Sequence, residues 1–128
     1  MSVLLDTHAA LWLLQGDPRL SAVALKRLSH LKREQIYISD LLFYEVALFI
    51  RKGKVAIEGD LTTFLRDFAA RFTVLPLDSE VASQAIDLPL PQGDPFDRVF
   101  VATALRHKLP LVTRDRQIRD ANIVETIW

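Results

Sequence analysis

Short apolar runs alternate along this chain with longer stretches whose apolar residues recur at helical spacing. The short runs are typical of strands in a parallel sheet, and the longer stretches of helices that pack against it. This alternation predicts an α/β fold with helices on both faces of a parallel sheet. The expected strands are 3–5, 36–39, 73–75, 111–113 and 123–127, and the expected helices are 8–14, 21–31, 40–52, 61–72, 79–88 and 95–108.

Start and stop signals support several of these helices. Ser21, Asp60 and Asp78 stand where an N-cap side chain would accept a free backbone N–H. Gly53 stands where the third expected helix ends, since glycine readily adopts the left-handed conformation that closes many helices. The segment that begins at Asp94 combines a cap with proline at the first helical position.

Size and composition narrow the class of protein. The 128 residues suffice for one domain with its own core, so we expect a single domain over 1–128. Sixteen basic residues balance sixteen acidic ones, so a broad basic belt for duplex DNA is not expected and a polyanion would bind through local clusters. The absence of cysteine excludes disulfides and thiolate metal sites. With neither a signal-peptide pattern nor a membrane-length apolar stretch, we expect a cytoplasmic protein.

Four carboxylates stand where a solvated loop does not explain them. Asp6 and Asp115 follow two of the expected strands, Glu45 is the only charge in the apolar stretch 41–50, and Asp97 opens another apolar segment. In open α/β sheets, ligands bind at the carboxyl ends of the strands. Carboxylates that converge there need a cation, and a divalent metal on oxygen ligands facing a phosphate meets that need.

Each of these acids also has a purely structural interpretation. Asp6 can cap a helix, and Asp97 can complement a helix dipole from the first turn. Asp115 can be a turn residue paired with a neighbouring arginine. Glu45 has only apolar neighbours three and four positions away, so its alternative is an exposed face that it solvates. Each structural interpretation is reasonable alone, but all four holding together, at positions that the topology brings to one edge of the sheet, is a weaker explanation than a shared site.

The other polar residues give weaker indications of function than the four acids. The three histidines His8, His30 and His107 have no spacing that suggests an acid–base pair, so we expect them at the surface. Three hydroxyl residues lack a nearby base and are expected to hydrogen-bond the acids or a metal-bound water: Thr7, Ser39 and Thr113. A basic cluster ends the third expected helix, where it can favour the helix dipole or contact a phosphate backbone: Arg51, Lys52 and Lys54.

Taken together, four segments carry a family resemblance: 4–8, 39–54 around Glu45, 94–98 with its DPFDR sequence, and 111–115. On these segments the chain resembles the PIN-domain ribonucleases, especially the toxins of VapBC toxin–antitoxin pairs. The DPFDR segment is typical of one branch of that family. Gly93 stands where similar proteins often have a basic residue, and Tyr44 where tryptophan is frequent.

The resemblance implies a three-layer α/β/α sandwich around a mostly parallel sheet of about five strands. It assigns Asp6, Glu45, Asp97 and Asp115 to an acidic metal site for Mg²⁺ or Mn²⁺. It also implies an RNA substrate, a homodimer and a small antitoxin partner. Asp94 is a fifth acid that we interpret chiefly as a helix cap.

Our leading hypothesis is therefore a metal-dependent endoribonuclease. Two alternatives stay open: a catalytically silent PIN-like module that binds RNA or protein, and a metal-dependent small-molecule phosphatase. The lack of a phosphate-cradling glycine-rich loop counts against the phosphatase. Three arginines next to the acids in sequence are expected to contact the RNA backbone: Arg98, Arg114 and Arg116.

The third expected helix is apolar nearly all round, although one face suffices to pack on the sheet. The remaining apolar residues exceed what a monomer usually exposes. We therefore predict a protein interface, within a homodimer or with a partner, formed by Phe43, Tyr44, Ala47 and Ile50.

Overall fold

The computed structural model describes residues 1–91 and 93–128, which form an α/β fold around one sheet. Five parallel strands lie in the order β3-β2-β1-β4-β5. The parallel sheet predicted from the alternating pattern is confirmed. The strands are β1 (Val3–Leu5), β2 (Ile36–Ser39), β3 (Thr73–Leu75), β4 (Leu111–Val112) and β5 (Thr126–Ile127).

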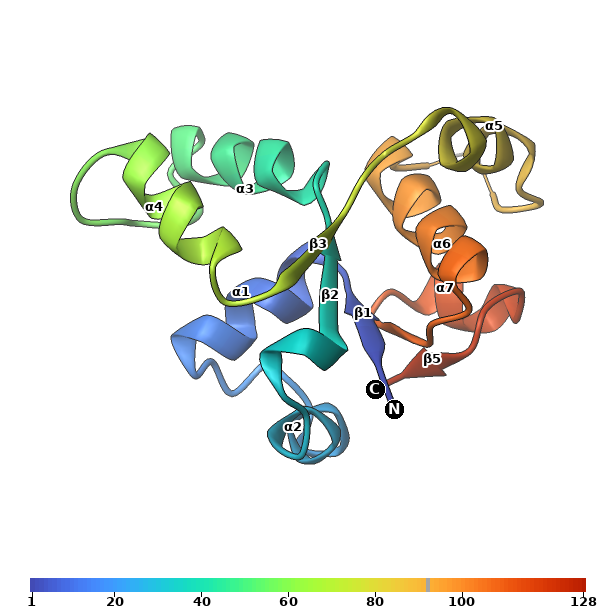
Figure 1. The fold of residues 1–128 in the computed structure, drawn as a ribbon, viewed down its shortest axis with the longest axis horizontal. Coiled ribbons are helices and arrows are strands. Elements are labelled where there is room, and N and C mark those ends of the chain that lie inside the picture. The colour runs from blue at the N-terminus through green and yellow to red at the C-terminus, as the bar shows by residue number, and fades with distance from the viewer. Residues whose placement is uncertain (92) are drawn as a thin grey trace.

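Helices cover both faces of the sheet. The first four helices lie on one side and the last three on the other, which makes a three-layer sandwich (Figure 1). A short 3-10 turn, η1 (Arg33–Gln35), leads into β2. The α-helices are α1 (Thr7–Gln15), α2 (Ala22–Ser29), α3 (Leu42–Arg51), α4 (Leu61–Ala69), α5 (Ser79–Asp87), α6 (Pro95–His107) and α7 (Arg116–Ala121).

The predicted caps lie at helix ends. Side-chain oxygens of Ser21, Asp60 and Asp78 accept backbone N–H groups at the starts of α2, α4 and α5. Asp94 does the same for α6, with Pro95 in the first turn. Gly53 follows the last residues of α3 with φ 76°, a conformation that costs glycine little.

Two predicted strands are longer than the observed ones, and two short elements were missed. The expected strand 123–127 is only Thr126–Ile127, and the strand expected over 111–113 ends at Val112. Helix α7 and the turn η1 were not predicted. Helix α7 has six residues with a single buried side chain, Ile118, so it lacks the repeating apolar positions that would have predicted it.

The sheet is buried on both faces, as a parallel sheet between two helical layers must be. All three residues of β1 are fully buried, and so are Leu111 and Val112 of β4. In α6 the buried run extends from Phe100 to Ala104. Strand β1 lies at the centre of the sheet, and the chain continues from it to β2 on one side and, later, to β4 on the other. The junction of β1 and β4 is thus the place where an α/β sheet of this order binds ligands.

Among the helices of the described residues, none is long and apolar enough to cross a membrane.

Candidate active site

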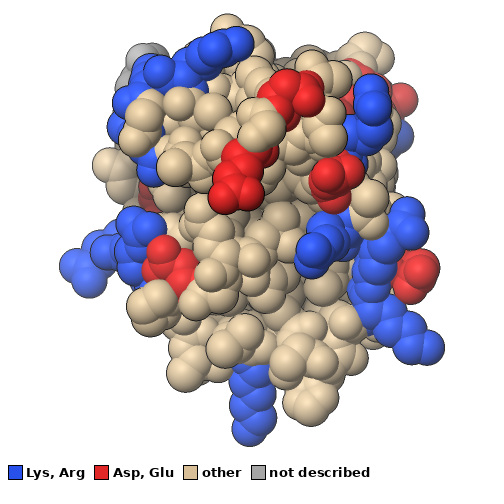
Figure 2. Space-filling view, turned by 90° about the vertical axis from the view of Figure 1, so that its left-hand side faces the viewer, with Lys and Arg blue, Asp and Glu red and all other residues tan. Residues whose placement is uncertain are grey.

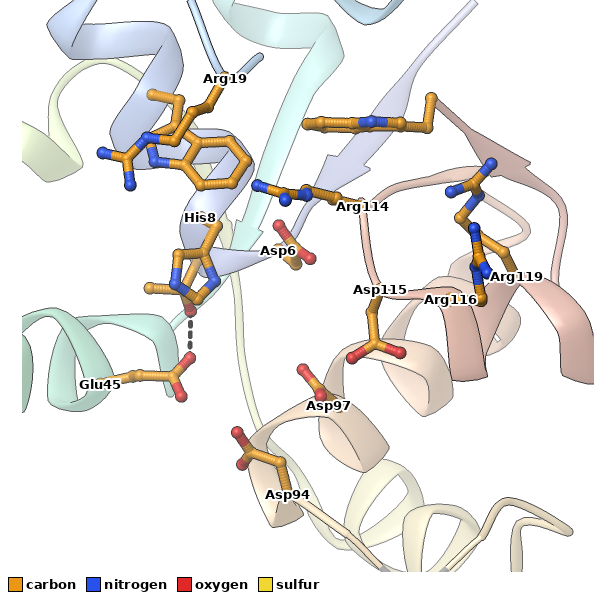
Figure 3. Close-up of a pocket in the computed structure, with 13 residues that line it drawn as sticks. Asp6, His8, Arg19, Glu45, Asp94, Asp97, Arg114, Asp115, Arg116 and Arg119 are labelled. Carbon is orange, nitrogen blue, oxygen red and sulfur yellow. Dashed lines mark hydrogen bonds between the residues drawn. The ribbon is translucent and has the colours of Figure 1, made fainter. Parts of the chain in front are cut away.

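A pocket of about 750 Å³ opens at the carboxyl ends of β1 and β4. The register pairs Leu5 with Val112, so the next residues of each strand, Asp6 and Thr113, leave the sheet side by side. Carboxylates from four separate segments face this pocket, as Figure 3 shows. They are Asp6, Glu45, Asp94, Asp97 and Asp115.

Asp6 serves both as a cap and as a pocket acid. Its Oδ1 accepts the Ala9 N–H at 2.9 Å, which caps α1, and the residue is 6% exposed. Burial raises its pKa from 3.8 to about 6, although the Thr113 side chain and the Ala9 N–H lower it, and Asp115 raises it further. The two interpretations of Asp6 are therefore compatible.

Glu45 projects from α3 into the same pocket and is 8% exposed. The Thr7 hydroxyl donates to its Oε1 at 2.5 Å, which satisfies one carboxylate oxygen inside the protein. Burial is the largest cause of a raised Glu45 pKa; Thr7 lowers it, and Asp94 and Asp6 raise it. The exposed, solvating alternative for Glu45 does not describe this position.

Asp97 lies in the first turn of α6 and carries the largest effect of crowding. Its pKa rises from 3.8 to about 8, first through burial and then through the negative charges of Asp94, Asp115, Asp6 and Glu45. The protein alone therefore resists full ionisation of these acids. A bound cation or a positively charged ligand would reduce the repulsion among these carboxylates and let them ionise.

Asp115 is the N-cap of α7 rather than a turn residue. Its Oδ1 accepts the Ile118 N–H at 3.1 Å, and its own N–H donates to the Thr113 hydroxyl at 3.1 Å. Asp94 accepts the Phe96 N–H at 2.9 Å and lines the pocket from its edge. Asp6, Asp94 and Asp115 are thus all caps, so the helix N-termini hold carboxylates around the opening.

The hydroxyl residues divide into two groups. Thr7 and Thr113 interact with the acids, the first by donating to Glu45 and the second beside Asp6. The buried Ser39 hydroxyl instead accepts the Leu41 N–H at 3.2 Å and so closes the turn after β2.

Arg98 has a different role from the predicted RNA contact. Its guanidinium donates to the carbonyl oxygens of Ala85 (3.0 Å), Ile86 (3.1 Å), Leu88 (2.7 Å) and Leu90 (3.3 Å). These carbonyls end α5 or follow it, and a helix end leaves such groups without partners inside the helix. Because the whole donor fork is engaged there, the prediction for Arg98 was wrong, and the residue fastens α6 to the end of α5.

The other predicted basic residues are exposed. Arg114 and Arg116 line the pocket. Lys54 lies over the Phe49 ring, with its Nζ 5.6 Å from the ring centroid. Arg51 and Lys52 end α3 with exposed side chains.

Five further pocket residues were not predicted: His8, Trp12, Arg19, Arg119 and Trp128. His8 is exposed, as expected, and its ring lies 5.3 Å from both Trp12 and Phe49. Desolvation, and then the charges of Arg19, Lys54 and Arg114, lower its pKa. Trp12 lies four residues after His8, a spacing that places the two side chains on one face of α1 but also fits ordinary core packing.

The predicted interface residues lie on α3 with graded exposure. Tyr44 is 62% exposed, and its ring stacks on Phe96 at 6.2 Å between centroids. Phe43, Ala47 and Ile50 are half-buried. The exposed tyrosine is therefore the outermost apolar group of this face.

The sequence pattern of the PIN domain family matches residues 3–124 of the chain. This chain belongs to the PIN domain family. The match covers the first four strands and ends before β5, and it confirms the resemblance that was carried by the four segments.

Relatives of this PIN domain include Ribonuclease VapC22 of Mycobacterium tuberculosis (strain ATCC 25618 / H37Rv). The two are 30% identical over 119 residues, which is 92% of this chain and 90% of the relative. FitAcB from Neisseria gonorrhoeae is a solved structure with 25% identity and a TM-score of 0.66, over 97% of this chain and 95% of that one. A toxin-antitoxin complex from Klebsiella pneumoniae shares the fold, with 23% identity and a TM-score of 0.71 over 99% and 97% of the chains.

Proposed function

We propose that this PIN domain is a divalent-metal-dependent endoribonuclease with Mg²⁺ or Mn²⁺ as its cofactor, and the toxin of a type II toxin–antitoxin pair that acts in the cytoplasm. The observation that carries the proposal is the gathering of Asp6, Glu45, Asp97 and Asp115 around one pocket, with a raised pKa at three of the four. The relative's name supports RNA as the substrate.

The donor set suits a hard divalent cation, because every candidate ligand is a carboxylate oxygen. Within residues 1–91 and 93–128, no three acidic or histidine side chains are already close enough together to hold a metal ion directly. Mg²⁺ usually binds one or two protein carboxylates directly and keeps several water ligands. Acids spread around a pocket therefore suit Mg²⁺ better than an ion that must lose all its water. Asp6 and Asp97 are the residues we assign to direct contact, with Glu45 and Asp115 beside them.

The metal, when bound, supplies charge neutralisation at the scissile phosphate and a lower pKa for its water. The protein's own groups hold the acids in place: the Ala9 N–H fixes Asp6, and the Thr7 hydroxyl fixes Glu45. Arg114 and Arg116 orient the phosphate backbone at the pocket rim. Water oxygen adds to phosphorus as the bond to the 3′ oxygen breaks, and a proton passes to that oxygen, which leaves a 5′-phosphate and a 3′-hydroxyl.

The test compares cleavage of RNA, single-stranded DNA and a small aryl phosphate in Mg²⁺ or Mn²⁺. We expect RNA cleavage that chelator abolishes and added metal restores, and that Asp6→Asn and Asp97→Asn each lower by at least a hundredfold. Asp120→Asn is the matched control, because Asp120 is an exposed acid of α7 outside the pocket lining. Hydrolysis of the aryl phosphate alone would identify a phosphatase, and RNA binding without hydrolysis would identify a silent module.

The protein partner has a candidate surface on the face formed by α1 and α4. A groove of about 290 Å³ lies there, and Figure 2 shows a broad area of this face without acidic or basic side chains. We propose that an amphipathic helix of the antitoxin covers this groove and that α3 mediates a homodimer through the Tyr44 face. The apolar residues that line the groove are Leu11, Leu14, Val55, Ala56, Phe64 and Phe68.

A further inference from the structure

One wall of the pocket is built from an indole ring with two guanidinium groups against it. The Cζ atom of Arg19 lies 5.0 Å from the Trp12 ring centroid, and that of Arg114 lies 5.6 Å from it. The Trp128 ring is 5.9 Å from the Trp12 ring. We infer that these four side chains, here called the Trp12 wall, bind a phosphate–base step of single-stranded RNA beside the acids, an inference that rests on the proposed nuclease function.

The wall is fixed by the fold. Trp12 is 6% exposed and is held in the core by α1, so its ring is a rigid support. Arg19 follows α1 and Arg114 follows β4, so two distant segments bring cations to the same ring. Asp17 further orients Arg19, because its carboxylate accepts hydrogen bonds from Nε at 3.1 Å and from Nη2 at 2.8 Å.

The positive charge of the wall is not cancelled by the acids of the same pocket. In the part of the chain that the structure describes, the ion pairs are Arg19–Asp17 and Arg106–Glu80, so Asp17 balances Arg19 and the net positive charge of the wall comes from Arg114. Figure 3 shows Arg19 and Arg114 on the opposite side of Asp6 from Asp94 and Asp97. The pocket is thus divided into an acidic sector for a metal and a basic sector for an anion.

A nucleic-acid strand uses both sectors at once. Its scissile phosphate lies at the acids, and the adjoining phosphate reaches Arg114, because guanidinium groups bind phosphate oxygens with two hydrogen bonds. Arginine planes and tryptophan rings also stack on nucleobases, which adds affinity with little sequence preference. A duplex keeps its bases stacked inside the helix, so this wall favours a single strand.

The experiment measures binding without cleavage. A labelled single-stranded RNA of mixed sequence is titrated with protein in chelator, and fluorescence anisotropy is followed at several salt concentrations. We expect Arg114→Gln to weaken binding about fivefold and to reduce the slope of log affinity against log salt by about 0.7, the value for one lost phosphate contact on a single strand. Arg66→Gln is the matched control, since Arg66 is an exposed residue of α4 that does not line the pocket.

Two further variants separate charge from ring chemistry. Arg114→Lys keeps the charge and should retain the salt slope while losing part of the affinity. Trp12→Phe keeps an aromatic core residue and should weaken RNA binding less than Arg114→Gln does. Wild-type affinity and salt slope in Arg114→Gln would overturn the Trp12 wall, and so would equal binding of a blunt RNA duplex.

The outcomes also separate this inference from the nuclease proposal. Asp97→Asn should bind the RNA at least as tightly as wild type in chelator, because it removes a negative charge next to the strand. Metal-dependent cleavage together with an Arg114→Gln variant that binds normally would overturn the wall and leave the nuclease standing. RNA binding that depends on Arg114, in a protein that cleaves no RNA, would support the Trp12 wall and overturn the nuclease proposal.

Discussion

The Thr7 hydroxyl donates a 2.5 Å hydrogen bond to Oε1 of Glu45, which joins residues 38 positions apart. The bond links the start of α1 to the first turn of α3 inside the pocket wall. Because it stabilises the ionised carboxylate, it opposes the burial that raises the pKa of Glu45. Thr7 therefore helps to keep Glu45 available as an anion.

Replacing Thr7 by valine keeps the shape and removes the bond. The Glu45 pKa should rise further, and unfolding free energy should fall by about 1–3 kcal/mol at a pH where Glu45 is ionised. The loss should shrink as pH falls and Glu45 becomes protonated in both states. Urea unfolding at acidic and at alkaline pH measures this, with Thr7→Ser as the control that retains a hydroxyl. An equal loss at every pH would show that the bond does not favour the ionised form.

Asp97 should make the protein less stable as pH rises. Its folded pKa is about 8 against an ordinary 3.8, so between these values the unfolded chain releases a proton that the folded chain retains. Stability therefore falls through this window and levels off above about pH 8. Asp97→Asn should be neutral or stabilising at pH 7 and should show a shallower pH dependence. Denaturant titrations of both proteins from pH 4 to 9 provide the comparison, and a wild-type stability that rises across this window would contradict the expectation.

Bound metal should make the wild-type protein more stable than Asp97→Asn, the opposite of the order expected without metal. At ten times its dissociation constant, Mg²⁺ should stabilise the wild-type protein by about 1.4 kcal/mol and Asp97→Asn by much less. Thermal melting with and without metal measures both shifts. Equal shifts in the two proteins would mean that the ion binds somewhere other than Asp97.

The strand positions and the acids were predictable from sequence for the same reason. A parallel strand buried on both faces has an uninterrupted apolar run, so a charge at its end, such as Asp6 after β1, is conspicuous. Glu45 was conspicuous because its helical neighbours are apolar. The placement of Asp97 and Asp115 at the same pocket required the resemblance or the fold class, since Asp97 is at the start of α6 and Asp115 follows β4, and no short sequence window contains both.

The missed features depend on geometry that short sequence windows do not contain. The pairing of Arg19 and Arg114 on one Trp12 ring depends on where two loops end in space. The direction of Arg98 depends on carbonyl groups at the end of α5 that have no partner within the helix, and no residue type in the sequence marks such groups. An arginine beside an acid in sequence suggested an RNA contact, but the helix turns the two side chains to different neighbours.

Arg98→Ala should destabilise the fold by about 2–4 kcal/mol, because it leaves several carbonyl groups without their charged donor. Arg98→Lys should recover little, since an ammonium group cannot reproduce a planar donor fork. Arg106→Ala is the matched control, because Arg106 forms an exposed ion pair with Glu80 that should contribute under about 1 kcal/mol. Urea unfolding gives all three values; similar losses in Arg98→Ala and Arg106→Ala would mean that the Arg98 bonds contribute little.

Tyr44→Asp should weaken self-association without altering metal binding. The tyrosine is 62% exposed, and its ring stacks on Phe96 at the outer face of α3. A carboxylate there would have to be desolvated when two copies meet. Light scattering over a range of concentrations should show a dimer for wild type and a shift toward monomer for the variant. Val23→Asp, at an exposed site on α2, is the control; a wild-type protein that stays monomeric at high concentration refutes the homodimer.

An antitoxin should bind through two separate features, the acidic pocket and the apolar groove. An Arg or Lys of the partner would pair with the crowded acids, which should weaken binding at high salt and make Mg²⁺ a competitor. Phe64 lines the groove, so Phe64→Asp should abolish co-purification with the product of the adjacent small open reading frame. Ile86→Asp should not, because Ile86 is 78% exposed on α5, in the opposite helical layer.

The assay co-expresses the pair and follows both complex formation and ribonuclease activity. The complex should be inactive, and raising salt should restore activity before the partner dissociates, because the charged contact at the acids weakens first while the apolar groove still holds the partner. Mg²⁺ should then act in the same direction as salt at far lower concentration, since it competes for the carboxylates themselves. A complex that forms but cleaves RNA at the full rate would refute the proposed contact between the partner and the acids, and it would leave the nuclease proposal intact. Failure of the adjacent product to bind at all would remove the toxin assignment, because an unrestrained ribonuclease would degrade the RNA of its own cell.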